Sequence, residues 1–235
     1  HLAGEPGRVH AEPERHQPTA AGPLFRGEGF FMPILFVSTV LLVGPAWCSH
    51  LCYIGAWDDA ASRRRPRPRR IPGWTRRVRL GLLMLVMTTA LVLRLAGAST
   101  VLASALAGGF GLVGVGLMLF WSRRMGSMMH CIVFCPIGLL ANLIGKLSLF
   151  RLRIGEGCTS CMLCRTACRY DALNKVDIDR RRPGLTCTLC GDCIGSCDEK
   201  QMEYVMPLLG GRSGRVAFLA LTAAAHAVFL GVARI

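Results

Sequence analysis

Two stretches of the chain repeat one arrangement of cysteines, GCTSCMLCRTACRY at 157–170 and TCTLCGDCIGSCDE at 186–199. Each reads C-x-x-C-x-x-C-x-x-x-C, and each cysteine of the second stretch lies 29 positions after its counterpart in the first. Eight of the 12 cysteines belong to these two runs. Chance spacing does not account for such agreement, so we interpret the segment as an internal duplication.

This spacing is the ligand pattern of a two-cluster [4Fe-4S] ferredoxin. Gaps of two residues let a tight loop place three thiolates at three corners of one cubane, and the fourth ligand must come from elsewhere. In such ferredoxins the fourth cysteine of each run binds the other cluster. The sequence therefore predicts two [4Fe-4S] sites, one formed by Cys158, Cys161, Cys164 and Cys197 and one formed by Cys187, Cys190, Cys193 and Cys168.

Two other uses of clustered cysteines compete with the iron–sulfur interpretation. Zinc sites with four cysteines favour paired C-x-x-C knuckles separated by a longer gap. Disulfides within so tight a triplet would be strained, and a reducing compartment favours free thiolates over six disulfides. The chain departs from the usual bacterial run, because Arg169 and Asp198 stand where proline would follow the fourth cysteine.

The composition of the chain is typical of a membrane protein. Of 235 residues, 52% are hydrophobic, and the mean hydropathy is positive. This composition predicts an α-helical integral membrane protein with a small α+β two-cluster ferredoxin-like domain. We expect a polar N-terminal segment at 1–29, a membrane region at 30–150, the ferredoxin-like domain at 151–210 and a C-terminal transmembrane helix at 211–235. Four stretches approach the roughly 20 residues that a bilayer requires: Phe30 to Trp47, Leu80 to Gly97, Val101 to Trp121 and Val216 to Val232.

Positive charge is concentrated between the first two expected spans. The formal net charge is +14, and nine arginines lie at 63–79. A nucleic-acid patch is the alternative, but the run adjoins apolar spans and lacks the framework of a binding module. The positive-inside rule instead places this loop and the ferredoxin-like domain in the cytoplasm. We therefore expect a multi-pass protein of the cell inner membrane, in contact with lipid and without a nucleic-acid partner.

The same topology places the N-terminus outside. The chain begins at His1, and its first 29 residues are polar with no spanning segment. An outside N-terminus needs a signal or an earlier span, so we expect the natural protein to continue upstream.

The four remaining cysteines form two C-x-x-x-C pairs, Cys48 with Cys52 and Cys131 with Cys135. Each pair follows a span that enters the cytoplasmic side, so both pairs should lie at the inner membrane face. If these segments are helical, positions i and i+4 share one face, and two such faces could bring four thiols together. Three interpretations remain open: a redox-active thiol set, an additional four-thiolate metal or cluster site, and free cysteines packed as small hydrophobes.

The order of these features resembles the NapH family of membrane polyferredoxins, with NosR as a relative. The shared features are a span, C-x-x-x-C, an arginine-rich loop, two spans, C-x-x-x-C-P-x-G and a duplicated ferredoxin run, between about Phe30 and Met206. Tyr53 replaces the proline of the first motif, and an extra apolar stretch follows the runs. The resemblance implies electron transfer between a quinone pool or membrane partner and other redox subunits, such as a cytochrome or an iron–sulfur protein.

The sequence offers no nucleophile–base arrangement, nucleotide fingerprint or carboxylate pair. We therefore expect a non-catalytic electron-transfer subunit of an oxidoreductase complex, whose substrate chemistry occurs on another subunit. The alternative is an assembly or regulatory redox protein for another metalloenzyme, as CcoG-like and NosR-like relatives suggest.

Overall fold

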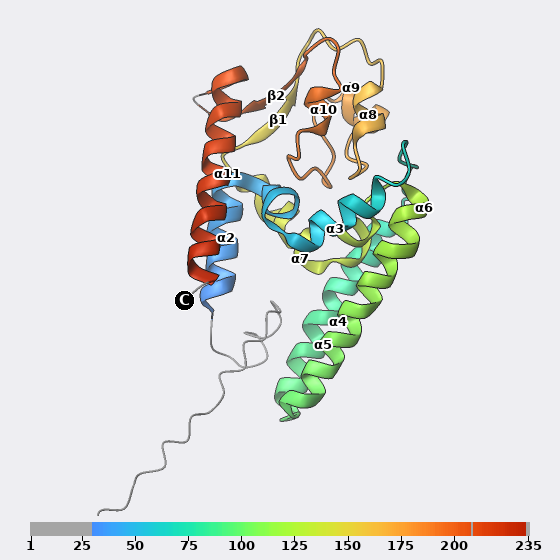
Figure 1. The fold of residues 1–235 in the computed structure, drawn as a ribbon, viewed down its shortest axis with the longest axis vertical. Helices are drawn as coiled ribbons and strands as arrows, with labels where there is room; N and C mark the ends of the chain where they lie inside the picture. Colours follow the sequence, from blue (N-terminus) through green and yellow to red (C-terminus); the bar gives the residue numbers. More distant parts are fainter. Residues whose placement is uncertain (1–29, 208, 234–235) are drawn as a thin grey trace, which may run out of the picture.

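Helices make up most of the structure, which is a computed structural model that describes residues 30–207 and 209–233 (Figure 1). The expectations for residues 1–29 lie outside this part of the chain. The α-helices are α2 (Phe31–Val43), α3 (Tyr53–Ser62), α4 (Thr75–Leu95), α5 (Thr100–Leu117), α6 (Arg123–Met125), α7 (Pro136–Ile144), α8 (Leu163–Ala167), α9 (Lys175–Asp179), α10 (Asp192–Gly195) and α11 (Gly211–Ala233). Short turns of 3₁₀-helix are η1 (Gly44–Ala46) and η5 (Gly145–Leu147), and turns of π-helix are η2 (Trp47–Leu51), η3 (Met118–Ser122) and η4 (His130–Phe134). Two strands, β1 (Arg151–Ile154) and β2 (Met202–Val205), form the small sheet.

Three helical stretches among the described residues are long and apolar enough to cross a membrane. They are Pro33–Leu51, Thr75–Leu95 and Thr100–Met125, with 19, 21 and 26 residues. They contain most of the first three predicted spans. The fourth predicted span falls within α11, a helix of 23 residues that is not among these three, so its crossing of the membrane stays a prediction.

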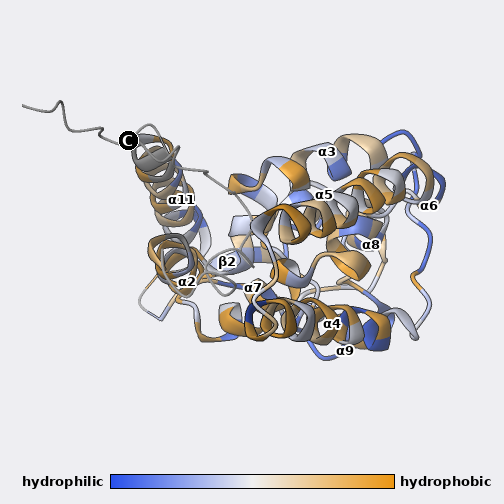
Figure 2. Cartoon of the chain, turned by 90° about the horizontal axis from the view of Figure 1, so that it is seen from below, coloured by the Kyte–Doolittle hydropathy of each residue, from blue (hydrophilic) through white to orange (hydrophobic). Residues whose placement is uncertain are grey.

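The helices α4 and α5 both project from the rest of the chain (Figure 1), and they lie apart from each other in the view of Figure 2. Only 11% of the most apolar 18-residue stretch of each helix is buried inside the protein. Most of the apolar surface of α4 and α5 is therefore exposed, as at a contact with lipid or with another protein. Figure 2 shows the hydrophobic colouring along α2, α4, α5 and α11 and the hydrophilic colouring around α6. This distribution fits helices that face lipid along their length and water at one end.

The short connection between α4 and α5 follows from two local signals. Gly97 has φ +62°, the left-handed conformation that commonly ends a helix at a glycine. Ser99 then caps the next helix, since its Oγ accepts a hydrogen bond from the Leu102 N–H at 3.3 Å. A serine cap of this kind satisfies one of the first N–H groups, which have no partner inside the helix.

The ferredoxin-like segment is closed by the antiparallel pair β1 and β2. Arg151 pairs with Val205, and Ile154 pairs with Met202. Alternate residues of both strands are buried, including Ile154 and Tyr204. The Tyr204 hydroxyl donates to the Leu189 carbonyl at 2.8 Å, which ties the sheet to the second cysteine run.

The buried ring of Phe218 joins α11 to the rest of the core. Its ring stacks on Tyr204 with centroids 4.3 Å apart and meets Phe150 edge-on at 5.4 Å. It also lies 5.6 Å from the ring of His50, which belongs to η2. One aromatic side chain therefore contacts the sheet, the segment before it and the first C-x-x-x-C turn.

We expect Phe218→Ala to lower the free energy of unfolding by about 3–5 kcal/mol, the usual cost of removing a buried aromatic ring. The measurement is thermal unfolding of the protein purified in detergent. The neighbouring Leu219 is exposed, so Leu219→Ala is the matched control and should change little. Equal stability of the two variants would contradict this assignment of the core.

Candidate iron–sulfur sites

Two cavities in the ferredoxin-like segment are each lined by four cysteines. One cavity is bordered by Cys158, Cys161, Cys164 and Cys197. The other is bordered by Cys168, Cys187, Cys190 and Cys193. The structure thus brings together the same two sets of four that the spacing predicts, each with three cysteines from one run and one from the other. All of these cysteines are free thiols.

The duplication extends to the backbone. Ser160 and Leu189 both have φ 57°, and they occupy equivalent positions 29 residues apart. Met162 corresponds in the same way to Gly191, at φ 66° and 87°. Left-handed conformations are uncommon outside glycine, so their repetition shows that both loops take the same curled path around their cysteines.

Backbone amides approach the fourth cysteine of each run. The Ala172 N–H donates to Cys168 Sγ at 3.3 Å, and the Gln201 N–H donates to Cys197 Sγ at 3.4 Å. These bonds are also equivalent, with a separation of 29 residues. Hydrogen bonds to sulfur stabilise the thiolate form and tune the potential of an iron–sulfur centre.

The chemistry of these thiols fits a bound metal cluster. Burial raises the pKa of Cys164 to about 11 and that of Cys187 to about 12, while metals bind the thiolate form. A positively charged metal centre would hold these buried sulfurs deprotonated. Four thiolates on one zinc ion would converge at about 2.3 Å from a single point. Cysteines placed around a cavity fit a cluster of several metal ions better than a single zinc ion.

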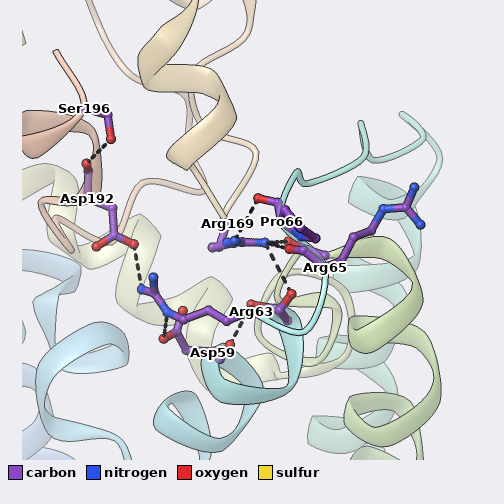
Figure 3. A network of polar contacts seen from close by, with 9 residues as sticks. Asp59, Arg63, Arg65, Pro66, Arg169, Asp192 and Ser196 are labelled. Atoms are coloured by element: carbon purple, nitrogen blue, oxygen red, sulfur yellow. Dashed lines mark hydrogen bonds and ion pairs between the residues drawn. The ribbon is translucent and has the colours of Figure 1, made fainter. Parts of the chain in front are cut away.

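Arg169 fastens the ferredoxin-like segment to the ends of the helices. Its Nη1 donates to the carbonyls of Ser62 at 3.3 Å, Arg65 at 2.7 Å and Gly126 at 2.8 Å, and its Nη2 donates to Pro66 at 3.2 Å (Figure 3). Ser62 ends α3 and Gly126 follows α6. The last carbonyls of a helix have no partner inside it, and a cation is favourable there. The arginine that replaces the usual proline therefore joins two parts of the fold.

A second set of contacts crosses the same junction. Arg63 forms an ion pair with Asp192 at 3.0 Å and also pairs with Asp59 (Figure 3). The side chain of Arg63 is half exposed, so this pair adds little stability. The Met128 N–H donates to the Arg169 carbonyl at 3.0 Å. The junction is thus specified mainly by buried hydrogen bonds to the backbone.

The two C-x-x-x-C pairs do not lie on continuous α-helices. Cys48 lies in η2 and Cys131 in η4, whereas Cys52 and Cys135 follow these π-turns with extended backbone. In each turn the second cysteine N–H bonds a carbonyl five residues back, at 2.9 Å and 2.8 Å. The expectation of an i, i+4 helical face is therefore replaced by a wider turn that leads into a new helix.

Glycine follows each pair at the same distance. A Cβ on Gly55 would collide with the Cys48 carbonyl oxygen, and one on Gly138 would lie 3.0 Å from the Cys131 carbonyl oxygen. Both turns therefore need a residue without a side chain where the following helix passes over them. The two C-x-x-x-C turns, with the glycine that follows each, are structural repeats.

A buried carboxylate links the repeats. Asp58 in α3 accepts hydrogen bonds from the Ser122 hydroxyl and, at 3.0 Å, from the Cys131 N–H. Burial raises the pKa of Asp58, and both hydrogen bonds oppose that shift. Sequence reasoning did not single out Asp58, although a carboxylate beside a strongly basic loop is a signal worth following.

The structure also buries an arginine that the sequence placed among the loop arginines. Arg79 in α4 is 4% exposed and lies beside the thiols of Cys48, Cys131 and Cys135. Its position near the start of an apolar helix was the available signal, since a charge there either faces water or has a specific neighbour.

We expect Arg169→Met to lower the free energy of unfolding by about 1.5–3 kcal/mol, because the backbone carbonyls lose charged donors. Thermal unfolding in detergent measures the loss, and iron content reports whether the cysteine loops remain intact. Arg180 is exposed, so Arg180→Met is the matched control. If both variants unfold like the wild type, Arg169 does not hold this junction.

Comparison with known proteins bears on the membrane half of the chain. A family model described as a 4Fe-4S binding domain matches residues 25–72 and 107–155. No curated protein and no solved structure matches the chain. The matched segments contain the two C-x-x-x-C pairs, whereas the eight ferredoxin-type cysteines lie outside them. The repeated match supports an iron–sulfur protein and is consistent with a polyferredoxin.

Proposed function

We propose that the protein is a membrane-bound electron-transfer subunit that carries two [4Fe-4S] clusters. It relays electrons between a quinone pool or membrane partner and other redox subunits, such as a cytochrome or an iron–sulfur protein. The observation that carries this proposal is the pair of four-cysteine cavities, each completed by the fourth cysteine of the other run.

The two sites are neighbours. Cys164 of one set and Cys193 of the other lie close enough to interact electrostatically, and the short helices that carry them, α8 and α10, pack together. Bound iron–sulfur clusters supply one-electron chemistry. The chain holds the two sets close, buries Cys164, Cys168 and Cys193, and donates N–H groups to Cys168 and Cys197. Closely spaced clusters are what a relay requires.

The membrane helices support the location. Three apolar helical stretches have sufficient length to span a bilayer, and the cysteine-rich segment is fastened at one end of them by Arg169. The arginine-rich loop at 63–79 lies at this same end, because Arg63 reaches Asp192 in α10. By the positive-inside rule this is the cytoplasmic face of the inner membrane.

The second candidate function is an assembly or regulatory redox protein for another metalloenzyme. It draws on the same cysteine sets, and the two functions differ in stoichiometry. A relay purifies as a permanent subunit of its oxidoreductase complex, whereas an assembly factor is transient and substoichiometric. The extensive exposed apolar surface of α4 and α5 serves either a lipid contact or a stable partner, and we favour the permanent subunit.

We expect Cys164→Ser and Cys193→Ser each to remove one cluster, with a loss of about four irons per chain, and to abolish electron flow through the complex. The measurements are iron analysis and turnover of the purified complex with its physiological donor. Thr159 is exposed on the first loop, so Thr159→Ser is the control and should retain both iron and turnover. Unchanged turnover in either cysteine variant would rule out the relay.

A further inference from the structure

A third cavity lies where the membrane region meets the ferredoxin-like segment. Its lining includes one cysteine from each C-x-x-x-C turn, Cys48 and Cys131. Arg79 and Asn142 line it from the helices, and Tyr170 lines it from the ferredoxin-like segment. The two ferredoxin-type cysteine sets do not border it.

Cys48 and Cys131 line this cavity, and the thiols of Cys52 and Cys135 lie near them. Cys131 interacts electrostatically with Cys48, Cys52 and Cys135. Cys48 interacts with Cys52 and Cys135, and these two interact with each other. Each thiol therefore has the other three as near neighbours, although the pairs are far apart in the sequence. The π-turns and the hydrogen bond that the Cys131 N–H donates to Asp58 hold this arrangement.

The residues that line the cavity include Arg79 and Asn142. The buried atoms Arg79 Nε and Asn142 Oδ1 lack hydrogen-bond partners among the described residues. A buried charge without compensation is strongly destabilising, and the groups that interact electrostatically with Arg79 are the thiols of Cys48, Cys135 and Cys131. Neutral thiols do not balance a guanidinium, but thiolates on a metal cluster carry net negative charge. Arg79 is thus placed for an anionic thiolate centre.

We propose that Cys48, Cys52, Cys131 and Cys135 bind a third [4Fe-4S] cluster, with Arg79 as its buried counter-cation. Four cysteine thiolates are the ligand set of such a cluster. The family model of a 4Fe-4S binding domain matches both segments that supply them, two cysteines from each. Gly138 leaves room for the guanidinium of Arg79. A Cβ added at Gly138 would lie 3.2 Å from Arg79 Nη2.

A cluster at this site would extend the proposed relay toward the membrane region. Its role in electron transfer rests on that proposed function. Tyr170 and Thr188 border both the third cavity and the cavity of the Cys168 set. The two cavities therefore share a wall. A cluster at the C-x-x-x-C turns lies on the membrane side of the ferredoxin-type clusters and next to one of them.

The test is iron and acid-labile sulfide analysis of the anaerobically purified full chain. We expect about 12 irons per wild-type chain, and about eight in the double variant Cys48→Ser/Cys131→Ser. The double variant should keep the ferredoxin-type EPR signals, whereas Cys164→Ser loses iron from the other set. The wild-type count does not depend on the folding of any variant.

Three results would overturn the third site: about eight irons in the wild type, no loss of iron in a folded double variant, or zinc bound to the four thiols. None of them affects the proposed relay through the other eight cysteines, which fails only if iron is missing from those sets. The two proposals are therefore separable in one experiment.

Arg79→Leu tests the counter-cation separately. It should lower the reduction potential of the third cluster, because reduction adds negative charge that the guanidinium stabilises, and Arg79→Lys should restore much of the loss. Arg77 is exposed on the same helix, so Arg77→Leu is the matched control. EPR-monitored redox titration gives the potentials. Equal potentials in the Arg79→Leu and Arg77→Leu variants would contradict the role of Arg79.

Discussion

The crossing of the fourth cysteine is the constraint on which the structure depends. Cys168 completes the set of the second run and Cys197 completes that of the first, so neither four-cysteine cavity exists unless both loops are folded. Arg169, the residue after Cys168, binds the carbonyls that end α3 and follow α6. The adjacent residues Cys168 and Arg169 therefore connect the assembly of the cysteine sets with the docking of the ferredoxin-like segment onto the helices.

The three cysteine-lined cavities form a chain of neighbours. The ferredoxin-type sets approach each other at Cys164 and Cys193, and the Cys168 set shares Tyr170 and Thr188 with the cavity between the C-x-x-x-C turns. The cavity between the C-x-x-x-C turns is lined by Cys48 and Arg79, which belong to the first two long apolar stretches. The three cavities therefore follow one another from the apolar helices to the ferredoxin-like segment.

Repetition made much of this predictable. The duplicated runs, together with the crossing of the fourth cysteine in two-cluster ferredoxins, predict which four cysteines share each cavity. Long apolar runs predict the three helical stretches that are long enough to cross a membrane. What sequence alone could not supply depends on packing between distant segments. C-x-x-x-C reads equally well as an α-helical face, so the π-turns were missed. Arg79 and Arg169 look like ordinary loop or surface arginines until the fold buries them.

The central claim is that two clusters lie next to each other in one small domain fastened to the membrane helices. Low-temperature EPR of the anaerobically reduced protein tests it most directly. Two paramagnetic clusters at neighbouring sites must interact, so the account predicts a broadened spectrum with split features from spin-coupled [4Fe-4S] centres. A simple spectrum of isolated clusters, or zinc in place of iron at the eight cysteines, would contradict it.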